Sequence, residues 1–113
     1  AVDNGADVIN LSLGSRVTSP IDSQAIQYAF DKGVVVVTAA GNDGRLQPDY
    51  PGRYATNFGI AVGAIDRNNT VPFFSNHAGT IPLDYVVAPG VEVLSTFPGN
   101  RYESKKGTSM ATP

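Results

Sequence analysis

The chain has 113 residues, no cysteine and a formal net charge of −2 at pH 7, with 42% hydrophobic and 16% charged residues. This size and composition predict a single globular domain or part of one, and they exclude a disordered chain, a disulfide scaffold and a cysteine-ligated metal site. The slightly acidic balance and the lack of a long apolar run argue against nucleic acid and membranes as partners.

The beginning of the chain predicts the last turn of a helix over residues 1–5, with Gly5 as its C-terminal stop. Residues 6–13 then carry Val8, Ile9, Leu11 and Leu13 between polar neighbours, and we expect a strand that is buried mostly on both faces. At the other end the sequence stops four residues after Ser109, which leaves a helix too short to be stable alone. We therefore expect the sequence to be cut through secondary structure at both ends.

A strand–helix–strand unit is predicted next. Ser19 is a good N-cap and Pro20 suits the first helical position, while Gly33 ends the helix. Apolar side chains between them recur at helical spacing. The β-branched run at residues 34–38 predicts a fully buried strand. The two flanking strands should be parallel and joined by a right-handed crossover.

The remaining elements are short. A loop rich in Gly, Asp and Pro covers residues 41–56, and residues 60–65 predict a third strand of small side chains. Residues 71–74 and 84–88 are further strand candidates. Residues 91–96 and 101–104 should pair as a hairpin around a Pro-Gly-Asn turn.

Two predicted strand ends carry little side chain and would let an extended peptide approach the backbone closely. They are Ser12-Leu13-Gly14 and Ala39-Ala40-Gly41-Asn42. Ligands of open parallel sheets bind at the carboxyl ends of strands, so both ends are candidate binding segments. Asn42 adds a side-chain amide donor at this edge.

The last seven residues place Ser109 in the first turn of a helix, after Gly107. Backbone N–H groups in a first turn have no helical acceptor and lie at the positive end of the helix dipole. A serine hydroxyl there is well placed for attack on a carbonyl, because these N–H groups can bind a developing oxyanion.

The string Gly-Thr-Ser-Met-Ala-Thr-Pro at residues 107–113 resembles the nucleophile motif of the subtilases, the subtilisin-like serine peptidases. Other landmarks of that family occur in the family's order, and they are residues 7–14, 36–42, 50–54, 60–64, 74–76 and 88–90. The resemblance covers the whole chain and implies a three-layer α/β/α fold with a mainly parallel sheet. Residues 1–113 would form the C-terminal part of the catalytic domain.

Position by position, the resemblance implies that Ser109 is the nucleophile and that Asn42, with the Ser109 backbone N–H, forms the oxyanion hole. It implies that Ser12, Leu13 and Gly14 pair with the substrate backbone, and that Ala39, Ala40 and Gly41 form one wall of the pocket for the residue before the scissile bond. Asp49 falls at the floor of that pocket, where a carboxylate would favour Arg or Lys. The alternative is that Asp49 faces solvent or pairs with Arg45.

The catalytic triad of the family consists of an aspartate, a histidine and the serine, and the chain lacks the motifs of the first two. It has neither the Asp-Ser/Thr-Gly turn that contains the aspartate nor the His-Gly-Thr-His string that contains the histidine. The single histidine, His77, matches a surface loop of the family. We therefore expect an inactive chain that carries the nucleophile without its base. A non-catalytic peptide-binding module is the alternative, whereas a nucleotide-binding domain is excluded by the absence of its glycine-rich motifs.

The resemblance also bears on cofactors, partners and location. It implies no cofactor for the chemistry, and a possible structural calcium held by backbone carbonyls of the stretch containing Gly52 and Tyr54, although the following segment is longer here. It implies a cis peptide before Pro51. The implied partners are a peptide or protein substrate, and either the missing N-terminal half of the domain or a second copy. It implies secretion, although this chain has no signal segment.

Overall fold

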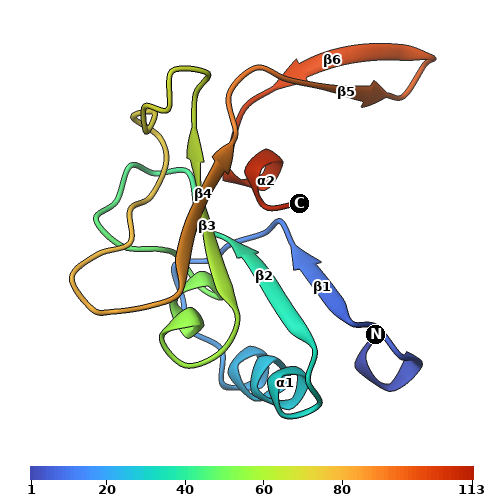
Figure 1. Cartoon of the computed structure of the whole chain (residues 1–113), viewed down its shortest axis with the longest axis vertical. Helices are drawn as coiled ribbons and strands as arrows, with labels where there is room; N and C mark the ends of the chain where they lie inside the picture. The colour runs from blue at the N-terminus through green and yellow to red at the C-terminus, as the bar shows by residue number, and fades with distance from the viewer.

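The computed structural model describes residues 1–113 and is built around a four-stranded parallel sheet (Figure 1). The strands lie in the order β1-β2-β3-β4. Their bounds are β1 Val8–Leu11, β2 Val35–Ala39, β3 Ile60–Ile65 and β4 Tyr85–Pro89. The other elements are α1 (Pro20–Asp31), α2 (Thr108–Ala111), the hairpin β5 (Val93–Phe97) and β6 (Arg101–Lys105), and the 3-10 turns η1 (Val2–Asn4) and η2 (Gly52–Thr56).

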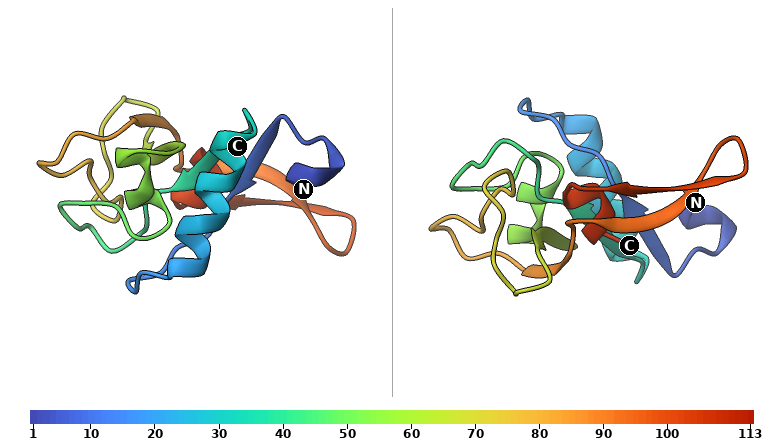
Figure 2. Two further views of the ribbon diagram at one scale, coloured as in Figure 1. Left: turned by 90° about the horizontal axis from the view of Figure 1, so that it is seen from below. Right: turned by 90° about the horizontal axis from the view of Figure 1, so that it is seen from above.

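The two α-helices pack on opposite faces of this sheet (Figure 2). On the α1 face the buried cluster consists of Ile26, Ala29, Val34 and Val36. On the α2 face it consists of Val62, Ala64, Phe74 and Ala111. Neighbouring strand residues point to opposite faces, so Val36 packs in the first cluster and Val37 against the second. The layers are helix, sheet and helix, and the predicted α/β class is confirmed.

The connection between β1 and β2 forms as its sequence predicts. Ser19 is the N-cap of α1, and its hydroxyl accepts a hydrogen bond from the Asp22 N–H at 3.2 Å. Pro20 occupies the first helical position, where its missing N–H has no cost. The chain then turns back at Gly33 with φ of 78° and enters β2 parallel to β1.

Strand β1 is an edge strand, which corrects the prediction that it is buried on both faces. It pairs only with β2, and Val8 is 60% exposed. Its partner across the ladder, Val35, is 44% exposed, so the β-branched run is not fully buried either. These apolar sequences are typical of a central strand, but no element of the chain covers the α2 face at this end of the sheet.

Two other predictions change. Residues 71–74 are not a strand but a turn, in which the Ser75 N–H donates to the Pro72 carbonyl at 3.0 Å. Pro72 has no N–H to contribute to a ladder. Residues 1–5 form a 3-10 turn, and Gly5 ends it at φ 81° as expected. The hairpin of β5 with β6 and the cis peptide between Tyr50 and Pro51 are both confirmed.

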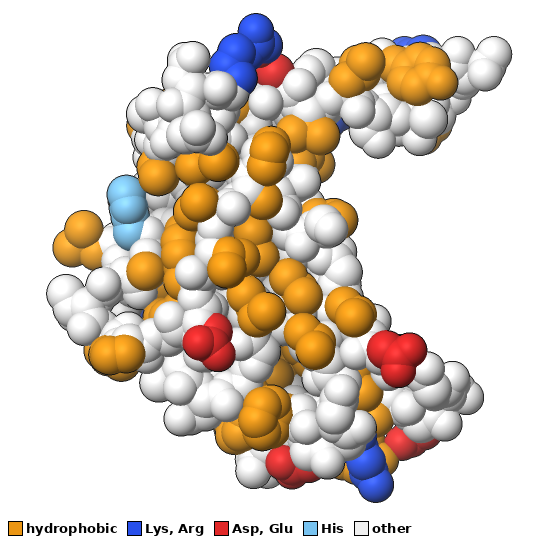
Figure 3. All heavy atoms as spheres, viewed as in Figure 1, with side chains coloured by type: hydrophobic (Ala, Val, Ile, Leu, Met, Phe, Trp, Pro, Cys, Tyr) orange, Lys and Arg blue, Asp and Glu red, His pale blue; other side chains and the backbone are white.

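The surface on the α2 side is apolar over the middle of the sheet and hollowed between the hairpin and β1 (Figure 3). None of the helices combines the length and apolar character required to cross a membrane.

Candidate active site

The C-terminal end of β2 lies beside the first turn of α2, which brings together two predicted functional segments. The Gly41 backbone N–H donates to the Thr108 hydroxyl at 3.1 Å, across 67 positions of sequence. Thr108 is fully buried. Gly107 precedes it at φ 148°, a backbone angle that side chains rarely adopt, so glycine is required where the chain enters α2.

The Asn42 side chain is fixed by hydrogen bonds to its amide oxygen. Asn42 Oδ1 accepts hydrogen bonds from the Thr108 backbone N–H at 2.7 Å and from the Thr108 hydroxyl at 3.1 Å. A backbone N–H can only donate, so the amide oxygen must face Thr108. The Asn42 Nδ2 group makes no hydrogen bond, and the residue is exposed, so both amide hydrogens are free for a ligand.

Ser109 is half-buried in the first turn of α2, and its hydroxyl donates to the Ser12 carbonyl at 3.2 Å. The predicted nucleophile thus touches the predicted substrate strand. A carbonyl oxygen does not accept a proton at neutral pH and cannot act as a base. His77 lies in a loop, where its backbone N–H donates to the Arg45 carbonyl at 2.8 Å, and its side chain makes no hydrogen bond with Ser109.

The segment Ser12, Leu13 and Gly14 follows β1 and is exposed. The backbone directly after Gly14 is fixed, because Ser15 and Tyr50 exchange two backbone hydrogen bonds, at 2.7 and 2.8 Å. The three residues before this bridge are therefore fixed at both ends while their backbone remains accessible. This is the arrangement that an added peptide strand needs.

The residues predicted to form the pocket wall, Ala39, Ala40 and Gly41, are all buried. The Ala40 carbonyl accepts the Asp49 backbone N–H at 2.8 Å, which fixes Asp49 against the wall. A methyl group built on Gly41 would lie 2.5 Å from Asp49 Oδ2, and one on Gly14 would lie 3.6 Å from Asp49 Cβ. Asp49 therefore lies between the two segments predicted to bind substrate.

The Asp49 side chain does not face solvent, which eliminates one alternative raised from the sequence. The residue is only 6% exposed. The other alternative, a pair with Arg45, is present: Arg45 Nη1 lies 3.7 Å from Asp49 Oδ1.

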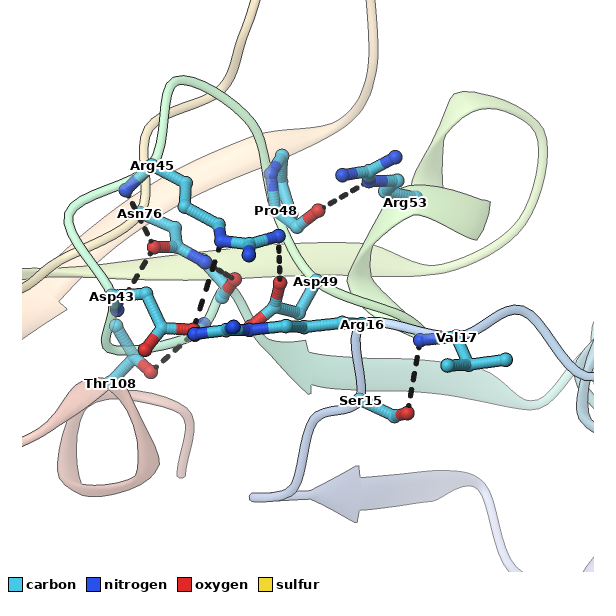
Figure 4. A network of polar contacts seen from close by, with 12 residues as sticks. Ser15, Arg16, Val17, Asp43, Arg45, Pro48, Asp49, Arg53, Asn76 and Thr108 are labelled. Atoms are coloured by element: carbon cyan, nitrogen blue, oxygen red, sulfur yellow. Dashed lines mark hydrogen bonds and ion pairs between the residues drawn. The ribbon is translucent and has the colours of Figure 1, made fainter.

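Asn76 organises the loop after Gly41 and was given no role from the sequence (Figure 4). It is fully buried, and its Oδ1 accepts the backbone N–H groups of Asp43 at 3.1 Å and Arg45 at 2.9 Å. Its Nδ2 donates to the Ala40 carbonyl at 3.0 Å. An asparagine within a matched family landmark was the only signal for it, since its partners lie more than thirty positions away.

Tyr85 also supports Asn76, because its Oη donates to the Asn76 backbone carbonyl at 2.7 Å. Burial raises the pKa of the Tyr85 hydroxyl above its ordinary value, and a hydrogen bond with Ser75 partly opposes this rise. The neutral tyrosine is the form that can donate this hydrogen bond.

The carbonyl of Tyr54 does not fit the calcium role that the family resemblance implies. It already accepts the backbone N–H groups of Asn57 at 2.9 Å and Phe58 at 2.8 Å. Both lone pairs are occupied by these bonds. The chain also has no cluster of three or more His, Cys, Asp or Glu side chains that could hold a metal ion.

A parallel α/β fold with a serine in the first turn of a helix, beside a free asparagine amide, is typical of one class of serine peptidase. The chain belongs to the subtilase family, whose family model, "Subtilase family", matches residues 1–113. Members of this family are serine endopeptidases.

The chain is 49% identical over 113 residues to Subtilisin BL of Lederbergia lenta and 46% identical to Thermitase of Thermoactinomyces vulgaris. Both matches include the whole of this chain, but it spans only 40% and 39% of those relatives. Among solved structures, a mutant of the protease domain of PatA is 32% identical with a TM-score of 0.87, over 98% of this chain and 41% of that one.

Proposed function

We propose that residues 1–113 supply the nucleophile and the oxyanion-binding half of a subtilisin-like serine endopeptidase. The observation that carries the proposal is the pair of hydrogen bonds from Thr108 to Asn42 Oδ1, which uses the amide oxygen and leaves the amide hydrogens unpaired next to the residue that precedes Ser109. A donor that is fixed before the substrate arrives stabilises an oxyanion without having to reorganise.

In this proposal the substrate backbone pairs with residues 12–14 as an added strand. The Ser109 hydroxyl exchanges its bond to the Ser12 carbonyl for an external base and attacks the peptide carbonyl. The Asn42 Nδ2 group and the Ser109 backbone N–H then donate to the oxyanion. The buried wall of Ala39, Ala40 and Gly41 orients the side chain that precedes the scissile bond. The chemistry uses no cofactor.

The base and its aspartate partner come from outside this chain, so the chain alone is inactive. Two observations support this: the only hydrogen bond of the Ser109 hydroxyl is to a carbonyl, and the chain spans about 40% of the relatives it matches. We propose one partial catalytic domain that is completed by the N-terminal part of the same protease, outside the cytoplasm. A structural calcium in the completed enzyme would need oxygens other than the Tyr54 carbonyl.

The Asp49 carboxylate sets the substrate class in this proposal. It is buried between Gly14 and Gly41, the two segments that would flank the side chain before the scissile bond. A buried carboxylate favours a cation over an apolar group, because unpaired charge is costly to bury. We therefore propose preferred cleavage after Arg or Lys.

The second candidate is a peptide-binding module without chemistry, and the contact of Ser109 with Ser12 favours it for the chain alone. A serine-directed fluorophosphonate separates the two functions. The chain is treated with the probe alone and after co-expression with the segment that carries the triad Asp and His, and labelled peptides are mapped. We expect rapid labelling of Ser109 only in the complemented sample. No labelling in either sample would support the binding module, and rapid labelling of the chain alone would contradict the proposed division of the site.

A further inference from the structure

Four charged side chains form a continuous series from the end of the predicted substrate strand to the buried Asp49 (Figure 4). Arg16 Nη2 lies 3.0 Å from Asp43 Oδ2, and Arg45 Nε lies 3.8 Å from the same oxygen. Arg45 Nη1 then lies 3.7 Å from Asp49 Oδ1. The Arg45 guanidinium is therefore shared between two carboxylates, one exposed and one buried.

The pairing with Asp49 is incomplete. Asp49 Oδ1 is buried and accepts no hydrogen bond, and 3.7 Å is too long for one from Arg45. A buried acceptor without a donor is unfavourable, and more so when it is charged. The Asp49 carboxylate consequently has an unused acceptor position on the side where the Arg45 side chain ends.

The Arg45 side chain is free to move although its backbone is fixed. Its N–H donates to Asn76 Oδ1, and its carbonyl accepts from the His77 N–H. The side chain is 35% exposed. If the guanidinium leaves Asp49 it still has Asp43 as a partner, so the exchange leaves no cation unpaired.

We propose that Arg45 is a specificity-determining residue, whose guanidinium occupies the Asp49 carboxylate until a cationic side chain of the substrate displaces it. The inference rests on the proposed function, because it assigns Asp49 to the site that receives the residue before the scissile bond. A substrate Arg or Lys supplies the hydrogen bond that Asp49 Oδ1 lacks, and Arg45 moves to Asp43. An apolar substrate side chain leaves Arg45 in place, so Arg45 reduces the discrimination that Asp49 alone would impose.

Binding of p-aminobenzamidine, an amidinium whose fluorescence reports binding, tests the inference on the full chain without turnover. Arg45→Gln should tighten its Kd roughly fivefold, the upper range for a partly exposed ion pair, because the competing cation is gone. Asp43→Asn should weaken binding, because Arg45 then has Asp49 as its only carboxylate partner. Asp49→Asn should abolish binding, and Arg45→Lys should behave like the unmodified chain.

Arg67→Gln is the matched control, since Arg67 is an exposed arginine paired with Glu92. It should leave the Kd unchanged, and circular dichroism verifies that every variant folds. An unchanged or weaker Kd in Arg45→Gln, or full binding in Asp49→Asn, would overturn the inference, as would the absence of binding in every protein. If these Kd changes are found but Ser109 is unreactive in the complemented protein, the proposed catalytic function alone is contradicted.

Discussion

The Asn42 side-chain oxygen and the Thr108 backbone N–H are joined by a 2.7 Å hydrogen bond that connects the end of β2 to the start of α2. The Thr108 hydroxyl adds a second bond to the same oxygen and accepts a third from the Gly41 N–H. Thr108, the residue before the proposed nucleophile, thus sets the orientation of the amide proposed to bind the oxyanion. We infer that Thr108 is a positioning residue, because its N–H and hydroxyl are used in the bonds to Asn42 and Gly41.

Thr108→Val tests this relationship in the complemented protease. The variant keeps the shape and the backbone N–H but loses both hydroxyl bonds, so the Asn42 amide can rotate and the Gly41 N–H is left unpaired. We expect kcat to fall about tenfold with KM unchanged, and stability to fall by about 1–3 kcal/mol for a buried unpaired donor. Thr108→Ser should restore both. If kcat of Thr108→Val equals that of the parent protease, the hydroxyl does not position Asn42.

Asn42→Ala and Ser109→Ala separate oxyanion binding from nucleophilic attack. Ser109→Ala should abolish turnover in the complemented protease. Asn42→Ala should lower kcat by about 10²–10³, the loss already known for the oxyanion-hole asparagine of subtilisin, with little change in KM. The hydrogen bond strengthens only in the transition state, so it contributes little to substrate binding. A rise in KM at constant kcat would assign Asn42 to ground-state binding instead.

Asp49→Gly addresses the substrate class. The ratio of kcat/KM for cleavage after Arg to that after Leu should fall by about tenfold or more, because a charged hydrogen bond contributes about 1.5–3 kcal/mol. Asp84→Gly is the matched control, because it removes an exposed carboxylate that takes no part in the series Arg16, Asp43, Arg45 and Asp49, and it should change the ratio far less. If the ratio is the same in Asp49→Gly and in the parent protease, Asp49 does not contact the substrate.

For this chain, the sequence predicts the local secondary structure better than it predicts which residues are buried. Ser19 and Pro20 define the start of α1 through contacts within three residues, and that prediction is confirmed. The exposure of Val8 depends on what lies beyond β1, which no local pattern reports. Pro72 removes a ladder donor from a run whose other residues favour a strand, and the turn forms instead.

The candidate site shows the same division. Motif strings predict Ser109 and Asn42 as site residues, whereas the bonds that orient Asn42 come from Thr108, 66 positions away. The burial of Asp49 between Gly14 and Gly41 likewise results from the parallel arrangement of strands whose ends meet only in the folded sheet. Side-chain types are visible in the sequence, but their long-range partners are not.

The raised pKa of the half-buried Tyr85 hydroxyl leads us to expect a loss of folding stability at high pH. Its pKa is raised in the folded chain by burial, so the unfolded chain loses the phenolic proton first as pH increases. Its contribution to stability is fully present below about pH 10, the ordinary tyrosine pKa, and is lost as pH rises through the folded value. Urea unfolding between pH 8 and 11.5 should show a steeper decline for the parent than for Tyr85→Phe. Tyr102→Phe, an exposed tyrosine, should decline like the parent.

The exposed edge of the sheet predicts the assembly of the isolated chain. Strand β1 pairs with β2 alone, so its outer backbone groups have no partner within the sheet, and its side chains include neither proline nor lysine. Unprotected edges of this kind pair with other strands. The apolar face around Val8 and Val35 is exposed beside it. We therefore expect the isolated chain to pair with a second copy or with the N-terminal part of the domain, rather than to persist as a stable monomer.

Size-exclusion chromatography with light scattering over a dilution series measures this directly. The isolated chain should elute as dimers or larger species that dissociate on dilution, and Val8→Lys should shift the population toward monomer because a lysine on an edge strand opposes pairing. Val17→Lys is the matched control, since Val17 is 73% exposed but lies in the loop after β1. It adds the same charge without altering the edge, and its elution should match the parent chain. A parent chain that is monomeric and unfolds cooperatively at every concentration would mean that the β1 edge is not a pairing surface, because an unprotected edge would associate as concentration rises.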